Sequence, residues 1–238
     1  MDEQFTRQPL YGQVAEALVE RIAQGYWQPG SMIPNEVDLA REIGVSTGTM
    51  RKALNRLEQN RLIVRRQGRG TFVEDHTTLA NLQRFQLLRR TDGEVLTNIG
   101  QLLAQRCETA SAEEARRLSV APGRPVLRTT RVMHHQSQPY FYELAVMAVD
   151  RFPGFDLADT GDYVLAALGQ KHGVLLGQAT EKLTLSEAPE EVAAALELDT
   201  GTVLMKLDRT INSLGGEPLE WRVGFCPLRD EKYVVTIV

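Results

Sequence analysis

The basic side chains of this 238-residue chain gather in one short segment. Residues 46–73 hold seven lysines and arginines against one acid, Glu58, although the whole chain has a net charge of -4. The seven are Arg51, Lys52, Arg56, Arg61, Arg65, Arg66 and Arg69. Cationic groups at this density suit a phosphate-bearing cofactor or a nucleic acid, unless they merely face water. The secondary-structure elements that carry these residues indicate whether the partner is a cofactor, a nucleic acid or water.

Three helices are predicted in and before this segment. Apolar residues recur at helical spacing over residues 10–24. Asn35 and Ser46 stand where caps are expected for helices over 36–43 and 47–59. Gly44 lies between these last two helices, and such a pair with a glycine-containing turn is typical of a helix-turn-helix.

The third helix is predicted to be amphipathic. At about 100° per residue, its apolar stripe consists of Met50, Ala53, Leu54 and Leu57. The opposite face carries Gly48, Arg51, Lys52, Asn55 and Gln59. That face offers cationic and amide donors and no carboxylate, which suits phosphates and base edges. For this helix taken alone, an ordinary solvated face is the alternative.

A basic hairpin is predicted directly after the third helix. RLIVRRQ and TFV alternate as two strands would, and they meet at Gly68-Arg69-Gly70. A helix-turn-helix followed by such a hairpin is a winged helix, whose hairpin reaches along DNA while the recognition helix enters the major groove. The order of elements therefore favours DNA over a phosphate-bearing cofactor.

Patterns for catalysis or metal binding do not fit their surroundings. GVSTG (44–48) matches a nucleophile motif, but that motif needs a preceding strand and here follows a helix. GRGTFV lacks the third glycine of a kinase loop. The adjacent His134 and His135 would point to opposite faces of a strand, and a turn position is expected for them. We therefore expect no catalytic residue, no metal and no cofactor.

Residues 9–73 resemble the winged-helix domain of the GntR family of bacterial transcription regulators. The matching segments are PLYGQVAEAL, PGSMIPNEVDLAREIGVSTGTMRKALNRLE and RRQGRGTFV. The resemblance implies DNA contacts for Thr49, Arg51 and Gly68, whereas Val37 and Thr47 replace arginines that are usual in the family. The full predicted set is Ser46, Thr47, Thr49, Arg51, Lys52, Asn55, Arg65, Arg66, Gln67, Gly68 and Arg69.

The second half of the chain contains an internal repeat at an offset of 78 residues. Its matched pairs include Leu118 with Leu196, Gly123 with Gly201, and Arg131 with Arg209. Each copy predicts a short helix with an acidic start, a turn, a strand, a hairpin and a second strand. The repeat indicates a mostly antiparallel sheet with pseudo-twofold character.

This half resembles the effector-binding (UTRA) domain of the HutC subfamily of GntR regulators, whose fold is related to chorismate lyase. PGRPVLRTTRVMHHQSQPYFYE and EPLEWRVGF carry the resemblance. It implies a small-molecule effector and places Arg131 and Glu143 at ligand-pocket positions. Met133 and Pro227 stand where phosphate-sensing members often have basic residues.

The expected strand register indicates which charged residues face one another at the effector site. If strands 126–133 and 140–147 pair about Ser137, Arg131 faces Glu143 on an otherwise largely apolar face. In the second copy Arg209 would face Arg222, and opposed arginines require a nearby anion or carboxylate. We expect an anionic or zwitterionic effector near these four residues. Internal pairing with Glu181, Asp208 or Glu220 is the alternative.

The prediction is an α+β chain. It has a winged helix-turn-helix at 1–75, a linker at 76–94 and an antiparallel-sheet effector domain at 95–238. It would repress transcription as a homodimer on double-stranded operator DNA, in the cytoplasm, under control of a small molecule. Widely spaced Cys107 and Cys226 fit a reducing compartment, and no apolar run reaches the ~18 residues of a membrane span. An enzyme with a chorismate-lyase-like domain, or a winged-helix interaction module, would be the alternatives.

Overall fold

The computed structural model describes residues 9–75, 87–94, 96, 100–157 and 165–235. The chain divides into two units, Met1–Thr78 and Leu79–Val238. Each unit buries its own set of apolar side chains.

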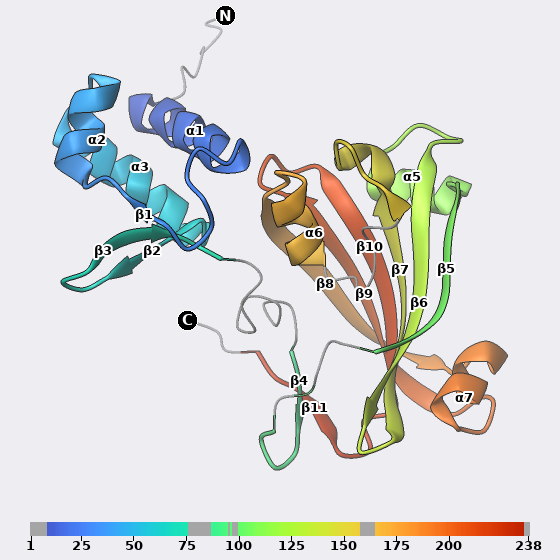
Figure 1. Ribbon diagram of the computed structural model, residues 1–238. Coiled ribbons are helices and arrows are strands. Elements are labelled where there is room, and N and C mark those ends of the chain that lie inside the picture. Colours follow the sequence, from blue (N-terminus) through green and yellow to red (C-terminus); the bar gives the residue numbers. More distant parts are fainter. Residues whose placement is uncertain (1–8, 76–86, 95, 97–99, 158–164, 236–238) are drawn as a thin grey trace, which may run out of the picture. The chain divides into compact units, whose positions relative to one another are not determined.

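The first unit combines three helices with a small antiparallel sheet (Figure 1). The elements are α1 (Leu10–Ala23), β1 (Met32–Ile33), α2 (Glu36–Ile43), α3 (Thr47–Gln59), β2 (Ile63–Arg66) and β3 (Gly70–Val73). Both predicted caps are confirmed. Asn35 Oδ1 accepts hydrogen bonds from the amides of Val37 and Asp38 at 3.0 Å, and Ser46 Oγ accepts one from the amide of Thr49 at 3.1 Å. These bonds satisfy amides that have no partner within the helix.

The buried stripe of α3 is the predicted one, and it holds the helix on α1 and α2. Met50, Ala53, Leu54 and Leu57 are at most 3% exposed. The hairpin is also as predicted, but a third strand, β1, pairs Met32 with Phe72 at its edge. The sequence does not predict β1, because a two-residue strand shows no alternation.

The second unit is built on a six-stranded antiparallel sheet with the order β5-β6-β7-β10-β9-β8. Its strands are β5 (Gln101–Thr109), β6 (Pro125–His135), β7 (Gln138–Ala148), β8 (Leu176–Glu187), β9 (Val203–Ser213) and β10 (Pro218–Cys226). Its helices are α5 (Ala112–Leu118), η1 (Val149–Arg151), α6 (Leu165–Lys171) and α7 (Glu190–Leu196).

The structure confirms the internal repeat. Helices α5 and α7 begin and end 78 residues apart, and so do strands β6 and β9. Strands β5-β6-β7 mirror β8-β9-β10 across the centre of the sheet. The sequence misses the outer strands β5 and β8 and helix α6, which lie outside the best-matched segments.

Different elements cover the two faces of the sheet. Helices α5 and α7 pack on one face, where Leu118 meets Trp221 and Leu196 joins the cluster of Tyr142 and Phe225. Helix α6 packs on one end of the opposite face, with Leu127 and Met147. The other end of that face packs against a two-stranded ribbon of β4 (Leu88–Arg90) and β11 (Glu231–Tyr233).

Part of the predicted linker belongs to this ribbon. Strand β4 lies inside the range 76–94 and pairs with β11 from the far end of the chain, so this part of the range is built into the second unit. Residues 76–86 of that range lie outside the described part of the chain. A three-residue strand whose partner is about 140 residues away leaves no local signal in the sequence.

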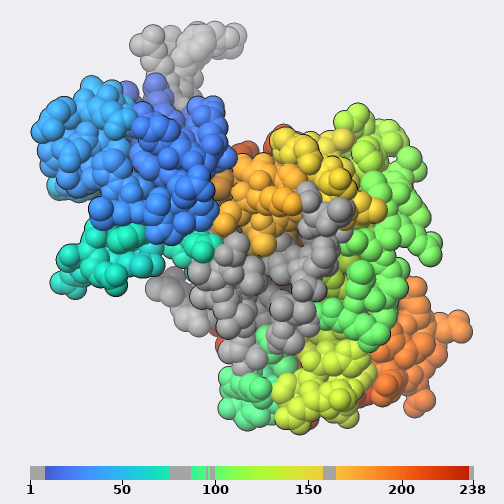
Figure 2. All heavy atoms as spheres, viewed as in Figure 1, coloured from blue at the N-terminus to red at the C-terminus, as the bar shows by residue number. Residues whose placement is uncertain are grey.

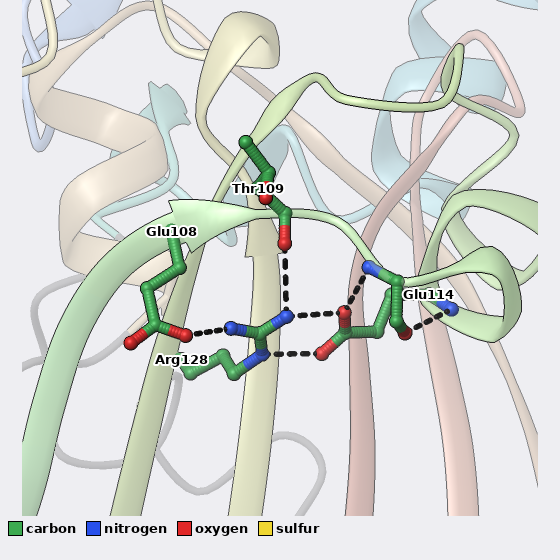
Figure 3. A network of polar contacts seen from close by, with 5 residues as sticks. Glu108, Thr109, Glu114 and Arg128 are labelled. Atoms are coloured by element: carbon green, nitrogen blue, oxygen red, sulfur yellow. Dashed lines mark hydrogen bonds and ion pairs between the residues drawn. The ribbon is translucent and has the colours of Figure 1, made fainter.

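A polar network ties α5 to the sheet (Figure 3). The Arg128 guanidinium donates two hydrogen bonds to the Glu114 carboxylate at 2.6 Å and also pairs with Glu108. Ser111 and Glu114 form a capping box at the start of α5. The Arg128 hydrogen bonds hold the pKa of Glu114 at about 2. This network fastens α5 to strands β5 and β6.

Candidate nucleic-acid interface and buried charge layer

The residues predicted to meet DNA lie at the surface of the first unit. Ser46, Thr47, Arg51, Lys52 and Asn55 are exposed along α3, and Thr49 is half-buried by its place beside the cap. The hairpin residues Arg65, Arg66, Gln67, Gly68 and Arg69 are all exposed. Gly68 has a φ of 70° in the turn, a conformation that side chains disfavour. In the space-filling view the hairpin tip projects from the helices of its own unit (Figure 2).

Arg51 is held by an acid of the neighbouring helix. Its Nη2 donates to Glu36 Oε1 at 2.5 Å, and its Nε lies 3.1 and 3.2 Å from the two carboxylate oxygens. The bonds from Arg51 hold the pKa of Glu36 below its usual range. The outer face of α3 carries no carboxylate, as predicted, but α2 supplies one.

The hairpin arginines have partners as well. Arg65 pairs with Glu58 of α3, and both side chains are about one-third exposed, at 36% and 38%. The Arg66 guanidinium lies 4.8 Å from the centre of the Phe72 ring. These contacts attach the hairpin's cations to α3 and to the hairpin itself, while Arg69 extends at its tip.

The second unit contains a layer of buried charges. Arg131 lies across from Glu143, and Arg222 lies across from Arg209, both as the register predicts. Arg209 in turn lies across from Glu181 of the edge strand β8. We use "charge layer" for Arg131, Glu143, Glu181, Arg209, Glu220 and Arg222. The layer lies between the apolar cluster under α6 and the one under the β4–β11 ribbon.

Pairing within the charge layer is extensive. Arg209 Nε donates to Glu181, and Arg222 lies 2.8 Å from Glu220 and 3.3 Å from Glu143. The exposed fraction is 7% for Arg131, 6% for Arg209 and 0% for Glu220. Tyr233 of the ribbon donates its hydroxyl hydrogen bond to Glu181, and burial raises the pKa of Tyr233. The layer holds three guanidinium groups and three carboxylates, so its formal charges cancel.

Asp208 does not join the charge layer, so that part of the internal-pairing alternative is wrong. Its neighbour Arg209 faces the layer, and adjacent residues of a strand point to opposite faces. Asp208 instead accepts hydrogen bonds from Arg117 at 2.7 Å and from the Trp221 indole at 3.0 Å, on the face that α5 covers.

The histidine pair also differs from its prediction. His134 and His135 end strand β6, and the turn follows at Gln136 and Ser137, which both have positive φ. Within the described residues, no group of three or more histidine, cysteine or acidic side chains could hold a metal ion. No helix in the described ranges is long and apolar enough to cross a membrane.

Each unit of the chain matches a known protein family. Residues 10–73 match the family described as bacterial regulatory proteins, gntR family, and residues 99–230 match the UTRA domain. The chain belongs to the GntR family. It is a DNA-binding transcriptional regulator with a UTRA ligand-binding domain, as its resemblance to the HutC subfamily implies.

Full-length relatives of this GntR regulator support the assignment. The transcriptional regulator Rv0792c of Mycobacterium tuberculosis is 32% identical over 221 residues, covering 89% of this chain and 80% of that protein. A probable fructoselysine utilization operon repressor of Escherichia coli is 23% identical, covering 99% of this chain and 96% of the relative. The crystal structure of the possible regulator YydK from Bacillus subtilis shares the fold, with a TM-score of 0.56, 19% identity and coverage of 97% and 100%.

The structure brings the predicted candidate residues of this GntR regulator together within each unit, and it adds partners that the sequence does not indicate. The predicted side chains of α3 and the hairpin share one unit, and the four predicted effector residues share one face of the sheet. Glu36 is missed as a partner of Arg51, since fifteen residues and a turn separate them. Tyr233 is missed because β11 leaves no pattern in the sequence.

Proposed function

We propose that α3 and the β2–β3 hairpin form the operator-binding surface, with Arg51, Thr49, Lys52 and Asn55 at base edges or phosphates and the hairpin residues 65–69 along the backbone. The observation that carries this proposal is the concentration of exposed cations on two adjoining elements of an otherwise acidic chain. Ser46 and Thr47, at the start of α3, would add donors near a phosphate.

The experiment is a gel-shift titration of the full chain on duplex DNA from upstream of its own gene. Retardation that weakens steeply between low and physiological salt would support the proposal, because each phosphate contact releases counterions. No retardation of any fragment would favour the interaction module instead. Binding that ignored salt would exclude this cationic surface.

We propose that the effector binds at the charge layer and carries an acidic group, with or without a cation. Since three carboxylates already balance the three arginines, a ligand acid must replace one of them or bind beside it. A zwitterion could pair its cation with the carboxylate that its acid displaces. Burial strengthens such charge-assisted hydrogen bonds.

A thermal-shift screen of carboxylates, phosphates and amino acids tests the effector class. A specific ligand at 100 times its dissociation constant stabilises the protein by about 2.7 kcal/mol. Arg222→Ala should abolish both that shift and the ligand's effect on operator binding. If this variant kept the thermal shift and the ligand's effect on operator binding, Arg222 would not be part of the effector site.

We further propose that the regulator is a cytoplasmic homodimer that represses transcription and catalyses no reaction. The E. coli relative is named as a repressor, and a twofold dimer fits palindromic half-sites about one helical turn apart. Sedimentation of the full chain tests the dimer, and a reporter gene behind the operator tests the sign of regulation. Turnover of any screened ligand by the purified protein would contradict the last point.

A further inference from the structure

The Arg51–Glu36 pair connects the two helices of the helix-turn-helix. Glu36 is the first residue of α2, directly after the Asn35 cap, and Arg51 lies in the second turn of α3. The carboxylate meets the guanidinium side-on, through Nε and Nη2. The Arg51 side chain is 62% exposed and that of Glu36 is 31% exposed, so the pair lies at the surface that would face DNA.

The side-on contact leaves a defined part of the guanidinium unused. Arginine has five N–H donors, and this pair engages the one on Nε and one of the two on Nη2. Among the residues that the structure describes, Glu36 alone contacts the guanidinium, which leaves the Nη1/Nη2 end of the fork open. That end matches the O6 and N7 acceptors of a guanine in the major groove, which is the commonest base-specific contact of arginine.

The contact with a guanine is favoured if the long Arg51 side chain is already fixed before DNA binds. A free arginine loses about 2 kcal/mol of rotamer entropy when it is fixed, and it can reach a phosphate as easily as a base. A partner that fixes the guanidinium beforehand lowers that cost and removes the alternative position. The other acid in the first turn of α2, Asp38, does not hold Arg51. Asp38 instead accepts hydrogen bonds from Asn35 at 2.7 Å and from Arg41 at 3.2 Å.

We propose that Glu36 is a positioning residue for DNA specificity, which orients Arg51 end-on toward a guanine and keeps it from the phosphates. The proposal rests on the proposed role of Arg51 at base edges. The contact from Arg51 also keeps Glu36 ionised, since it lowers the pKa of that carboxyl. Glu36 thereby lowers the overall affinity for DNA slightly and increases the discrimination between sequences.

The test compares two duplexes bound by the full chain. One has the sequence that the wild-type chain enriches from a randomised pool, and the other is a scrambled duplex of equal length. Glu36→Gln should reduce the ratio of the two affinities about tenfold. It should also strengthen binding to the scrambled duplex and steepen its salt slope by about 0.9, because Arg51 becomes free to contact a phosphate.

Asp38→Asn is the matched control. It removes the same charge from the same helix without touching Arg51, so it should leave the affinity ratio within about twofold of the wild type. Glu36→Asp keeps the charge on a shorter stem, and it should retain more discrimination than Glu36→Gln. In an Arg51→Ala background, Glu36→Gln should change the ratio no further.

Several outcomes would overturn the proposal. Glu36 would be a mere inhibitor of DNA binding if Glu36→Gln strengthened binding to both duplexes equally. A general charge effect would be shown if Asp38→Asn and Glu36→Gln behaved alike. A persistent effect of Glu36→Gln without Arg51 would show that Glu36 acts by another route. If the wild-type chain enriched no sequence at all, the proposed DNA contacts of Arg51 would fail, and this role with them.

Discussion

Arginines in the two units of this regulator have contrasting surroundings. In the first unit, the side chains of Arg51 and Arg65 are 62% and 36% exposed, and each pairs with one carboxylate. In the second unit, the side chains of Arg209 and Arg222 are 8% and 15% exposed, and they lie within a layer of three carboxylates. The same residue type thus forms a surface contact in one unit and a buried network in the other.

The difference determines how each set can exchange partners. An exposed ion pair contributes about 0–1 kcal/mol, so DNA can compete for Arg65 or share Arg51 at little cost to the fold. Breaking a buried pair leaves an uncompensated charge and costs several kcal/mol. A ligand that bound at the proposed charge-layer site would therefore have to replace the charge of any carboxylate that it displaced. The proposed DNA surface would exchange partners at little cost, whereas the proposed effector site would accept only a ligand that brings a charge of its own.

Removal of Glu181 should have the largest effect on stability. Glu181→Ala takes the carboxylate from Arg209 and leaves the layer with an excess positive charge, so we expect a loss of about 3–5 kcal/mol in the free energy of unfolding of the second unit. Urea denaturation followed by Trp221 fluorescence in a Trp27→Phe background measures this unit. Glu58→Ala, which breaks the exposed pair with Arg65 in the first unit, is the control; followed by Trp27 fluorescence in a Trp221→Phe background, it should cost less than about 1 kcal/mol. Equal costs would refute the contrast.

Glu114 tests a buried pair outside the charge layer, and its effect depends on pH. Its pKa in the folded chain is about 2, below the ordinary 4.5, because Arg128 donates to it. A lowered pKa stabilises the fold above pH 4.5, and that stabilisation is lost as the pH falls from 4.5 toward 2. The gap between the two values corresponds to about 3 kcal/mol.

Glu114→Gln should therefore destabilise the second unit by up to about 3 kcal/mol at neutral pH and by less than half of that at pH 3. Urea denaturation of both proteins at the two pH values provides the difference. If the difference in the free energy of unfolding were the same at both pH values, the Glu114 charge would not contribute to stability, and only the packing of the side chain would. Glu113→Gln, at an exposed position of the same helix, controls for the general loss of a carboxylate.

Much of this architecture follows from local patterns in the sequence. The caps at Asn35 and Ser46, the α3 stripe and the Arg131–Glu143 register all depend on spacing within one or two elements. The register is right even though a bulge lies between Met133 and His134. The tight turn at Gln136–Ser137 offsets that bulge, so the paired residues on the far side stay as predicted.

The features that sequence reasoning misses depend on distant pairing. Strand β4 is recognisable only through β11, and Tyr233 reaches Glu181 only because that ribbon packs on the sheet. Glu36 has two roles in its helix, as a favourable charge in the first turn and as a partner of Arg51. The first role is visible in the sequence, whereas the second depends on the angle between two helices, which no local pattern encodes.

Arg51→Ala should separate binding from stability in the first unit. We expect a loss of about 1–3 kcal/mol in operator affinity and relaxed specificity at one base pair, because a base-contacting fork is removed. The free energy of unfolding should stay close to that of the wild type, since the side chain is exposed. Binding to a set of single-base operator variants measures the first effect. A uniform loss over all variants would place Arg51 at a phosphate instead.

The smallest expected effect is at the hairpin tip. Arg69→Gln removes one exposed cation from the turn at Gln67–Arg69 and should leave the fold unchanged. If Arg69 contacts a phosphate, affinity should fall by a similar factor for operator and scrambled DNA, and the salt slope should shrink by about one unit. Titrations of both duplexes at several salt concentrations measure this. Gly68→Ala provides a contrasting change at the same tip, because it strains a backbone with positive φ and keeps the charge. If Arg69→Gln instead changed the sequence preference, the hairpin would contact bases in the groove, and the first unit would contain two specificity elements rather than one.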